Sequence, residues 1–246
     1  MDYYSKETYG QRIASVYDQL YPGFDPAAIQ VLIELADGGN ALELGIGTGR
    51  IALPLMQSGV DVQGIDASPD MVSRLHAKPG GKNIRVTLGD FADVPVQGQF
   101  SLIYVVVNTI YALLSQEEQV RCFQNVTRHL ASGGVFVLEA FVPDLARFTG
   151  GQNMRVTHIG ESEIHFDAAM VEVDKQKIIA QHAVLTPQGI QFYPVQIRYI
   201  WTSEMDLMAR LAHLHLKARW ADWKKNTFSA NSSMHISVYE PSPIPA

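Results

Sequence analysis

Hydrophobic and polar positions along the chain form blocks that predict strands followed by helices. Five short apolar runs share the length and composition of buried strands: 40–44, 60–66, 84–90, 100–108 and 133–141. Three intervening segments share apolar residues at helical spacing: 50–59, 68–78 and 115–130. Because strands and helices alternate, we expect an α/β fold with a doubly wound, mostly parallel sheet.

The two ends of the chain depart from this rhythm. Residues 1–37 predict a helical region in two parts, broken at Pro22 and Gly23. Residues 151–202 contain no long helical pattern and instead show β-rich runs separated by turn signals, which predict three or four antiparallel strands. A helix and a closing strand pair follow in 203–246. We therefore expect one domain over 1–246, with a core at 38–150 and an antiparallel insertion at 151–202.

Composition narrows the function classes. The 246 residues are 47% hydrophobic and 18% charged, and the formal net charge of −6 gives no basic excess for a nucleic-acid partner. This balance is easier to reconcile with a small or neutral substrate. A lone cysteine, Cys122, excludes an intramolecular disulfide. We find neither a secretory signal pattern nor an apolar run near the roughly 20 residues that span a bilayer, so we expect a cytoplasmic protein without membrane contact, either monomer or homodimer.

The most informative stretch is LELGIGTGR, where three glycines, Gly45, Gly47 and Gly49, follow the first predicted strand. Glycines permit a tight turn with positive φ and let a ligand approach the backbone. Ligands in open α/β sheets bind at the carboxyl ends of strands. Asp66 ends the second predicted strand, where an acid can accept hydrogen bonds from ribose hydroxyls, and Asp90 ends the third, near where an adenine amine could donate.

The loop does not follow the dinucleotide fingerprint G-x-G-x-x-G. Its pattern is G-x-G-x-G, and Arg50 stands where the third glycine would be. Glu43 directly precedes the loop, where a carboxylate would repel a pyrophosphate. An amino-acid-bearing nucleoside with a cationic portion fits better, while a nicotinamide-dependent oxidoreductase remains the alternative enzyme.

These segments resemble the class I S-adenosylmethionine-dependent methyltransferases. The resemblance rests on LELGIGTGRIALPL, VQGIDASPDMV, VTLGDFADVP, FSLIYVVVNTIYALLSQEEQ and LASGGVFVLEAF, which occur in order within 40–141. It implies a Rossmann-like seven-stranded sheet, S-adenosylmethionine as cofactor and no metal. The YDQLY motif and the late β-rich insertion are similar to the small-molecule subgroup, which includes sugar N-methyltransferases of natural-product pathways.

The resemblance also implies roles for individual residues. The glycines would line the methionine part, Asp66 would bind the ribose and Glu43 would hold the loop or the cofactor ammonium. Residues 1–37 would form a lid. The full set of implied cofactor-binding residues is Glu43, Gly45, Gly47, Gly49, Asp66, Ala67, Met71, Asp90, Phe91, Tyr17 and Tyr21.

Methyl transfer from a sulfonium is an in-line displacement, so the protein must align the nucleophile and remove a proton where needed. The candidate catalytic residues are Asn108 after the fourth strand, Glu139 at the end of the fifth, and His165 in the insertion. The expected activity is methyl transfer to oxygen or nitrogen of a small molecule. A cyclase or binding protein that keeps the cofactor without methylating is a further alternative, because fold alone does not fix function.

Overall fold

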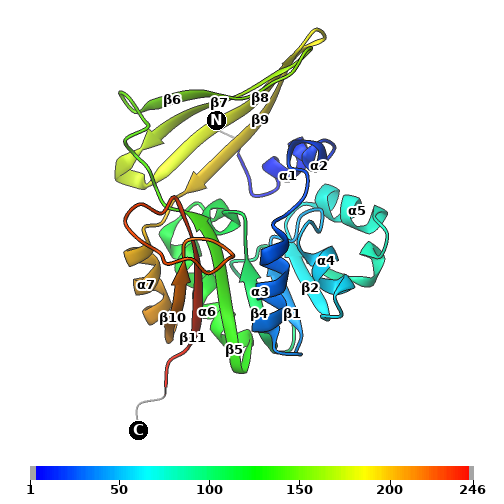
Figure 1. Cartoon of the computed structure of the whole chain (residues 1–246), viewed down its shortest axis with the longest axis vertical. Helices are drawn as coiled ribbons and strands as arrows, with labels where there is room; N and C mark the ends of the chain where they lie inside the picture. Colours follow the sequence, from blue (N-terminus) through cyan, green and yellow to red (C-terminus); the bar gives the residue numbers. More distant parts are fainter. Residues whose placement is uncertain (1–3, 244–246) are drawn as a thin grey trace.

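The computed structural model describes residues 4–243, which form two sheets (Figure 1). The predicted boundaries at residues 1 and 246 lie outside the described residues. The larger sheet, sheet A, has the strand order β10-β11-β5-β4-β1-β2-β3. Its strands are β1 (Ala41–Leu44), β2 (Val62–Asp66), β3 (Arg85–Leu88), β4 (Phe100–Val105), β5 (Leu130–Phe141), β10 (Leu214–Trp220) and β11 (Met234–Pro241).

Sheet A is parallel except around β11, which is antiparallel to β5 and to β10. The chain builds outward from β1 in one direction through β2 and β3, and in the other through β4 and β5. The strand order therefore reverses between β1 and β4, which is where open α/β sheets bind ligands. This arrangement confirms the predicted Rossmann-like, mostly parallel sheet of seven strands.

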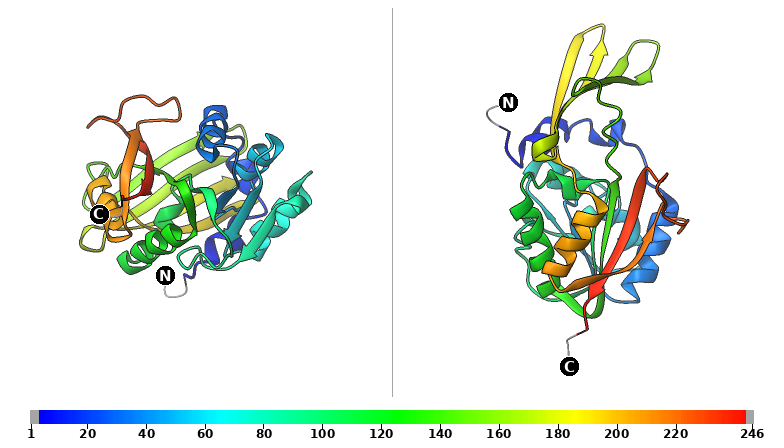
Figure 2. Two further views of the ribbon diagram at one scale, coloured as in Figure 1. Left: turned by 90° about the horizontal axis from the view of Figure 1, so that it is seen from below. Right: turned by 90° about the vertical axis from the view of Figure 1, so that its left-hand side faces the viewer.

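Helices cover both faces of sheet A (Figure 2). One face packs against α6 and α7 and the other against α3, α4 and α5. Among the described residues, no helix is long and apolar enough to cross a membrane. The helices are α1 (Thr8–Ile13), α2 (Tyr17–Leu20), α3 (Pro26–Ala36), α4 (Ala52–Gln57), α5 (Pro69–Ala77), α6 (Gln116–His129) and α7 (Thr202–Leu211), with 3₁₀ turns η1 (Gly81–Asn83), η2 (Thr109–Ala112) and η3 (Val173–Lys175).

Local sequence signals explain where several helices begin. The Asp25 carboxylate accepts a hydrogen bond from Ala27 N at 2.9 Å at the start of α3. Ser115 and Glu118 form the predicted capping box of α6. Two expectations were wrong in detail. Residues 4–37 contain three helices rather than two, and α4 begins at Ala52 rather than at residue 50, because positive φ angles at the loop glycines keep the preceding chain out of the helical conformation.

The predicted insertion forms a separate antiparallel sheet, sheet B, with the order β6-β7-β8-β9. It stands beyond the end of sheet A from which the β1 and β4 loops emerge (Figures 1 and 2). Its inner face rests on the sheet A core through Val171 and Ile178, and on the N-terminal helices through Val184 and Tyr193. The strands are β6 (Gln152–Ile159), β7 (Ile164–Glu172), β8 (Lys177–Thr186) and β9 (Gly189–Arg198).

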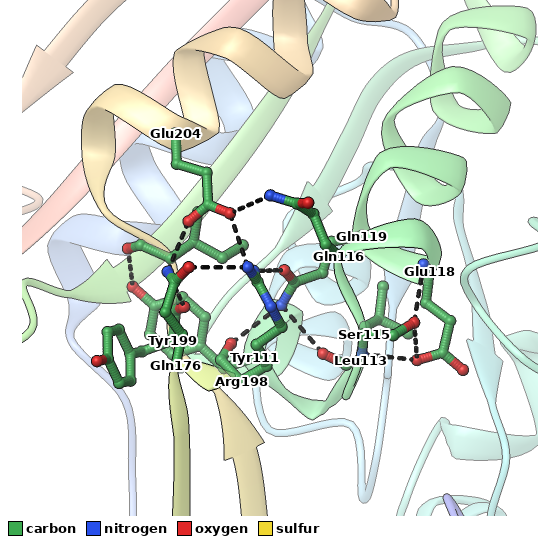
Figure 3. Close-up of polar contacts among 11 residues, drawn as sticks. Tyr111, Leu113, Ser115, Gln116, Glu118, Gln119, Gln176, Arg198, Tyr199 and Glu204 are labelled. Atoms are coloured by element: carbon green, nitrogen blue, oxygen red, sulfur yellow. Dashed lines mark hydrogen bonds and ion pairs between the residues drawn. The ribbon is translucent and has the colours of Figure 1, made fainter. Parts of the chain in front are cut away.

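A buried polar network joins sheet B to the helices of sheet A (Figure 3). Arg198, at the end of β9, donates to Gln119 of α6 and, at 2.8 Å, to the Glu204 carboxylate of α7. Gln176, in the turn before β8, donates to the same carboxylate at 2.7 Å. Because Arg198 is buried, this network fixes how the insertion sits over the core.

Candidate active site

The glycine loop after β1 is packed against the protein at Gly45 and open at Gly47. Gly45, Gly47 and Gly49 all have positive φ angles, between 57° and 77°. A Cβ at Gly45 would lie 2.4 Å from Thr109 Cγ2, so this glycine allows η2 to pack against the loop. A Cβ at Gly47 would meet nothing within 4 Å. The open side at Gly47 therefore leaves the backbone accessible to a ligand, as the sequence suggested.

Asp66, the last residue of β2, organises this loop. Its Oδ2 accepts a hydrogen bond from Gly47 N at 2.7 Å and its Oδ1 accepts one from Ser68 N at 2.8 Å. Burial raises the pKa of Asp66, while the backbone hydrogen bonds oppose that rise. The backbone of Ala67 also donates to this carboxylate, and since a carboxylate has about four acceptor positions, Asp66 keeps capacity for a ribose hydroxyl. Ala67 follows it, and the buried Met71 packs in the adjacent turn of α5.

Glu43 lies beneath the loop and is almost fully buried. Burial raises its pKa to about 8, although a hydrogen bond from Tyr104 and the positive charge of Arg50 favour the ionised form. The Tyr104 hydroxyl donates to Glu43 Oε2 at 3.0 Å. Glu43 also lines a cleft together with Gly45, Gly47 and Tyr17. A cationic group in that cleft would compensate the buried charge of Glu43.

Asp90 and Phe91 follow β3 on the other side of the loop. Asp90 Oδ1 accepts a hydrogen bond from Ala92 N at 2.9 Å, and Oδ2 lies 3.4 Å from the Lys6 ammonium. Phe91 is buried, and its ring lies 3.8 Å from the position of a Cβ at Gly45. The structure thus brings both residues to the edge of the site that begins at the glycine loop.

The N-terminal helices close over the same loop. Asp18 of α2 accepts a hydrogen bond from the Thr48 hydroxyl at 2.6 Å and forms an ion pair with Lys78 at 2.8 Å. Tyr17 lines the cleft, and the Arg50 guanidinium lies 5.7 Å from the centre of its ring. The rings of Tyr17 and Tyr21 are 5.1 Å apart. Tyr17 of α2 therefore lies at the loop, and Tyr21, which directly follows α2, packs against it.

Asn108 and Glu139 hold the loops at the ends of β4 and β5. Asn108 Oδ1 accepts from Phe141 N at 2.7 Å. Glu139 accepts from Val107 N at 2.8 Å and from the Trp223 indole at 2.9 Å. These hydrogen bonds give both side chains a positioning role. Glu139 also lines a second cavity of about 200 Å³, which shares four residues with the first cleft: Arg50, Ile51, Val106 and Val107.

His165 lies on the inner face of sheet B, apart from the glycine loop in sequence but directed toward the same end of sheet A. Its ring centre is 4.9 Å from that of His158 and 5.8 Å from that of His182. His165 Nε2 lies 3.4 Å from Glu163 Oε1. Between residues 4 and 243, no group of three or more His, Cys, Asp or Glu side chains is placed to hold a metal ion.

Sequence reasoning missed several residues that the fold brings to the site. Tyr104 is hidden in a continuous apolar strand, and Trp223 lies in the connection between β10 and β11. Asp18 lies within the YDQLY motif and Thr109 within the segment of the fourth strand, but the sequence assigned neither of them a role. The only available signal was a polar group within an apolar segment, as at Tyr104, since the partners of these residues are 30 to 84 positions away in sequence.

The fold and the loop define the class. A glycine loop at the switch point, an acid at the end of β2 and a buried carboxylate beneath the loop form a nucleoside-binding site of the Rossmann-like transferases. Residues 41–134 match the family described as "Methyltransferase domain". The CcbJ methyltransferase from Streptomyces caelestis is 34% identical, with a TM-score of 0.91 over 98% of this chain and 100% of that one. The chain belongs to the S-adenosylmethionine-dependent methyltransferases.

Two further proteins are similar over most of the chain. The cypemycin N-terminal methyltransferase of Streptomyces sp is 26% identical over 205 residues, which are 83% of this chain and 84% of that protein. The sugar N-methyltransferase KedS8 from Streptoalloteichus sp ATCC 53650 has a TM-score of 0.67 at 18% identity, covering 93% of each chain, and shows the fold. Enzyme class and cofactor are thereby established, and the oxidoreductase alternative is set aside.

Proposed function

We propose that this enzyme transfers the methyl group of S-adenosylmethionine to an amine nitrogen of a small-molecule acceptor. The observation that carries the proposal is the cleft at the glycine loop, which Tyr17 of the N-terminal helices lines, with sheet B packed on those helices. A cleft covered in this way suits a small acceptor, or the end of a longer one. Two of the similar proteins are named for nitrogen acceptors.

The residues of the loop fit the cofactor. Gly47 leaves space beside the backbone, and Asp66 keeps acceptor capacity for a ribose hydroxyl. Glu43 places a buried carboxylate where the cationic part of the cofactor would bind. When bound, S-adenosylmethionine supplies a methyl group activated by its positive sulfur. Asp90 and Phe91 would flank the adenine, with Ala67 and Met71 beside the ribose.

The chain contributes alignment and exclusion of water. Tyr17 and Tyr21 would cover the cofactor from α2, with the Tyr17 ring available to a positive centre. Asn108 and Glu139 would hold the β4 and β5 loops where the acceptor enters. Proper alignment of two reactants is worth roughly 7–11 kcal/mol of barrier in favourable cases, so a rigid set of loops is itself catalytic.

Two measurements test this proposal. Isothermal calorimetry should detect S-adenosylhomocysteine binding to the intact protein, and Asp66→Ala should abolish it. Transfer of labelled methyl groups should then be measured with matched acceptor pairs, such as methyl 3-amino-3-deoxyglucopyranoside and methyl glucopyranoside, and with the tripeptide Ala-Ala-Ala. We expect label on the amine and none on the matched hydroxyl compound.

The outcomes separate the alternatives. Label on the hydroxyl compound alone would overturn nitrogen as the acceptor atom. Label on the tripeptide but not on the amino sugar would keep nitrogen and move the acceptor to a peptide amine. Cofactor binding without transfer to any acceptor of the panel would favour the non-methylating cyclase or binding protein over our proposal.

A further inference from the structure

The inner face of sheet B holds a histidine–carboxylate pair that the site described above does not use. His182 of β8 and Asp167 of β7 are cross-strand partners, and His182 Nδ1 lies 2.7 Å from Asp167 Oδ1. The His182 side chain is 11% exposed. Within residues 4–243, its other ring nitrogen, Nε2, is buried and has no hydrogen-bond partner.

The pair fixes the state of the imidazole. An ionised carboxylate only accepts hydrogen bonds, so His182 Nδ1 must carry a proton, and in the neutral imidazole Nε2 then presents the lone pair. Asp167 is held ionised, because hydrogen bonds from His182 and Arg155 keep its pKa below the usual value even though burial opposes this. The Arg155 guanidinium donates to Asp167 Oδ2 through two nitrogens, at 3.1 and 3.2 Å.

The groups around the pair connect it to the cofactor loop. Tyr193 of β9 and His165 of β7 face the His182 ring at centre distances of 6.2 and 5.8 Å. Burial raises the pKa of Tyr21, and the nearby Asp167 charge raises it further. Tyr21 in turn packs against Tyr17, whose side chain lines the cleft. Tyr21 therefore lies within the electrostatic influence of Asp167 and packs on Tyr17, which lines the cleft beside the glycine loop.

The carboxylate partner distinguishes His182 from His235, the buried histidine of sheet A. Buried polar atoms are nearly always hydrogen-bonded, so a buried Nε2 without a partner needs an explanation. Among the described residues, Nε2 of His165 and of His235 is also buried without a partner, so the carboxylate on Nδ1 is what sets His182 apart from His235. The Nδ1 of His235 faces Ser237 rather than a carboxylate, and burial lowers the pKa of His235 to about 4, with the charge of Arg219 lowering it further. His235 lies inside sheet A, whereas His182 lies on the face that covers the site.

We propose that His182, oriented by Asp167, is the general base that receives the proton of the acceptor ammonium group. The proposal rests on the proposed function and replaces His165, whose Nε2 lies beside Glu163, as the base within the insertion. The acceptor would be an amine that is protonated in solution and enters between the inner face of sheet B and the glycine loop.

The step balances as follows in atoms and charge. The N–H bond of the ammonium breaks and its proton goes to His182 Nε2, which leaves an imidazolium facing the ionised Asp167. The nitrogen lone pair then forms the N–C bond to the methyl group while the C–S bond breaks, and its electron pair stays on sulfur. The products are the methylated amine in its protonated form, whose nitrogen now carries the positive charge that leaves sulfur, and S-adenosylhomocysteine with a neutral sulfur. The proton taken up by His182 passes to water.

The first test observes the imidazole directly. Long-range ¹H–¹⁵N spectra of the ¹⁵N-labelled protein with S-adenosylhomocysteine bound should show His182 as the Nδ1–H tautomer, with the resonance assigned by its loss in His182→Asn. Asp167→Asn should remove this preference. Addition of methyl 3-amino-3-deoxyglucopyranoside should shift His182 Nε2 but leave His158 unchanged. An Nε2–H tautomer, or no shift on amine addition, would overturn the proposal.

The second test uses rates. We expect His182→Asn to lower kcat by about 10²–10⁴-fold, the usual contribution of a general base, with S-adenosylhomocysteine affinity within twofold of the wild type. The loss of kcat in His182→Asn should become smaller as the pH approaches the pKa of the acceptor amine, because the free amine then needs no base. His158→Gln, which changes a half-exposed histidine of the same sheet, is the matched control and should keep the wild-type rate.

The two proposals fail in different ways. If the wild type methylates no amine of the panel, the proposed function fails, and the tautomer and its response to the amine still decide the role of His182. If amines are methylated and His182→Asn loses the same rate at every pH, or loses none, the proposed function stands and His182 is not the base.

Discussion

Individual residues at the glycine loop affect stability and binding in different ways, and Glu43 does so through its charge. A carboxylate buried in a low-dielectric site is costly when charged, and this is why its pKa rises to about 8. In the ligand-free protein, the raised pKa of Glu43 makes the free energy of unfolding depend on pH. The contribution of Glu43 to stability is fully present below its ordinary pKa of 4.5 and is lost as the pH rises toward 8. A positively charged ligand in the cleft favours the ionised form of Glu43 over the protonated form that burial favours.

The affinity for S-adenosylhomocysteine should therefore increase with pH. Between pH 5.5 and 7.5 the free protein binds a proton on Glu43 that the complex releases, so the association constant should rise by up to about tenfold per pH unit. Calorimetry across this range measures the slope. In Glu43→Gln, which keeps a similar shape without the titrating group, the affinity should be weaker and nearly flat with pH. An equal slope in both proteins would contradict this role of Glu43.

Substitutions at two of the loop glycines should affect cofactor affinity and protein stability to different degrees. Alanine at either Gly47 or Gly49 must adopt positive φ, which costs about 1–2 kcal/mol. Gly47→Ala adds a methyl group to open space, so S-adenosylhomocysteine affinity should fall more than stability. Gly49→Ala places Cβ 2.3 Å from Leu75 Cδ1 and should add about 1–3 kcal/mol of overpacking. Thermal unfolding and calorimetry on both variants check this, and a larger loss of stability in Gly47→Ala would refute it.

At the scale of elements, the attachment of sheet B depends on one buried guanidinium. Arg198 connects β9 to α6 and α7, and Glu204 receives further hydrogen bonds from Gln116 and Gln176 (Figure 3). Removing one partner of a buried ion pair leaves the other charge without compensation in a poorly solvated place. This network therefore determines whether the inner face of sheet B stays over the loop.

Arg198→Met should lower the free energy of unfolding by about 3–5 kcal/mol, measured by denaturant unfolding. The control is Lys217→Met, which removes a partly exposed ion pair with Glu240 at the other end of the protein and should cost about 0–1 kcal/mol. Methyl transfer should fall in Arg198→Met even below its unfolding temperature, because the acceptor side of the site moves with sheet B. Equal costs for the two substitutions would contradict the anchoring role.

At the scale of the whole molecule, the cover formed by α1 and α2 is the part with the least internal support. These helices have six and four residues, and α2 buries none of its residues. Their attachment runs through Asp18, Thr48 and Lys78 and through a small apolar cluster shared with sheet B. Isolated helices of this length are not stable by themselves, so their order depends on what lies beneath them.

S-adenosylhomocysteine should therefore slow amide hydrogen exchange in residues 8–20 while leaving β1, β4 and β5 unchanged. These central strands are buried and should already exchange only through global unfolding. The strand pair β10 and β11 serves as an internal reference away from the loop. If protection appears in sheet A but not in residues 8–20, the N-terminal segment does not act as a lid.

The sequence by itself determined the parts that depend on local chemistry. Alternating apolar runs predicted the order of strands and helices, and the insertion was visible as a loss of helical periodicity after residue 150. The loop glycines and the acids Glu43, Asp66 and Asp90 identified a nucleoside-type cofactor, because each lies within a few residues of a predicted strand end. These features need no partner from far along the chain to be recognised.

Which side chains meet depends on contacts between distant segments, and these appear only in the folded protein. The strand order places β4 beside β1, and thereby Tyr104 beneath Glu43, 61 residues away. The register of β7 and β8 pairs Asp167 with His182 and distinguishes this histidine from seven others. Cross-strand register and helix placement arise from the packing of distant segments, and periodicity in one segment carries no information about the residue that will face it.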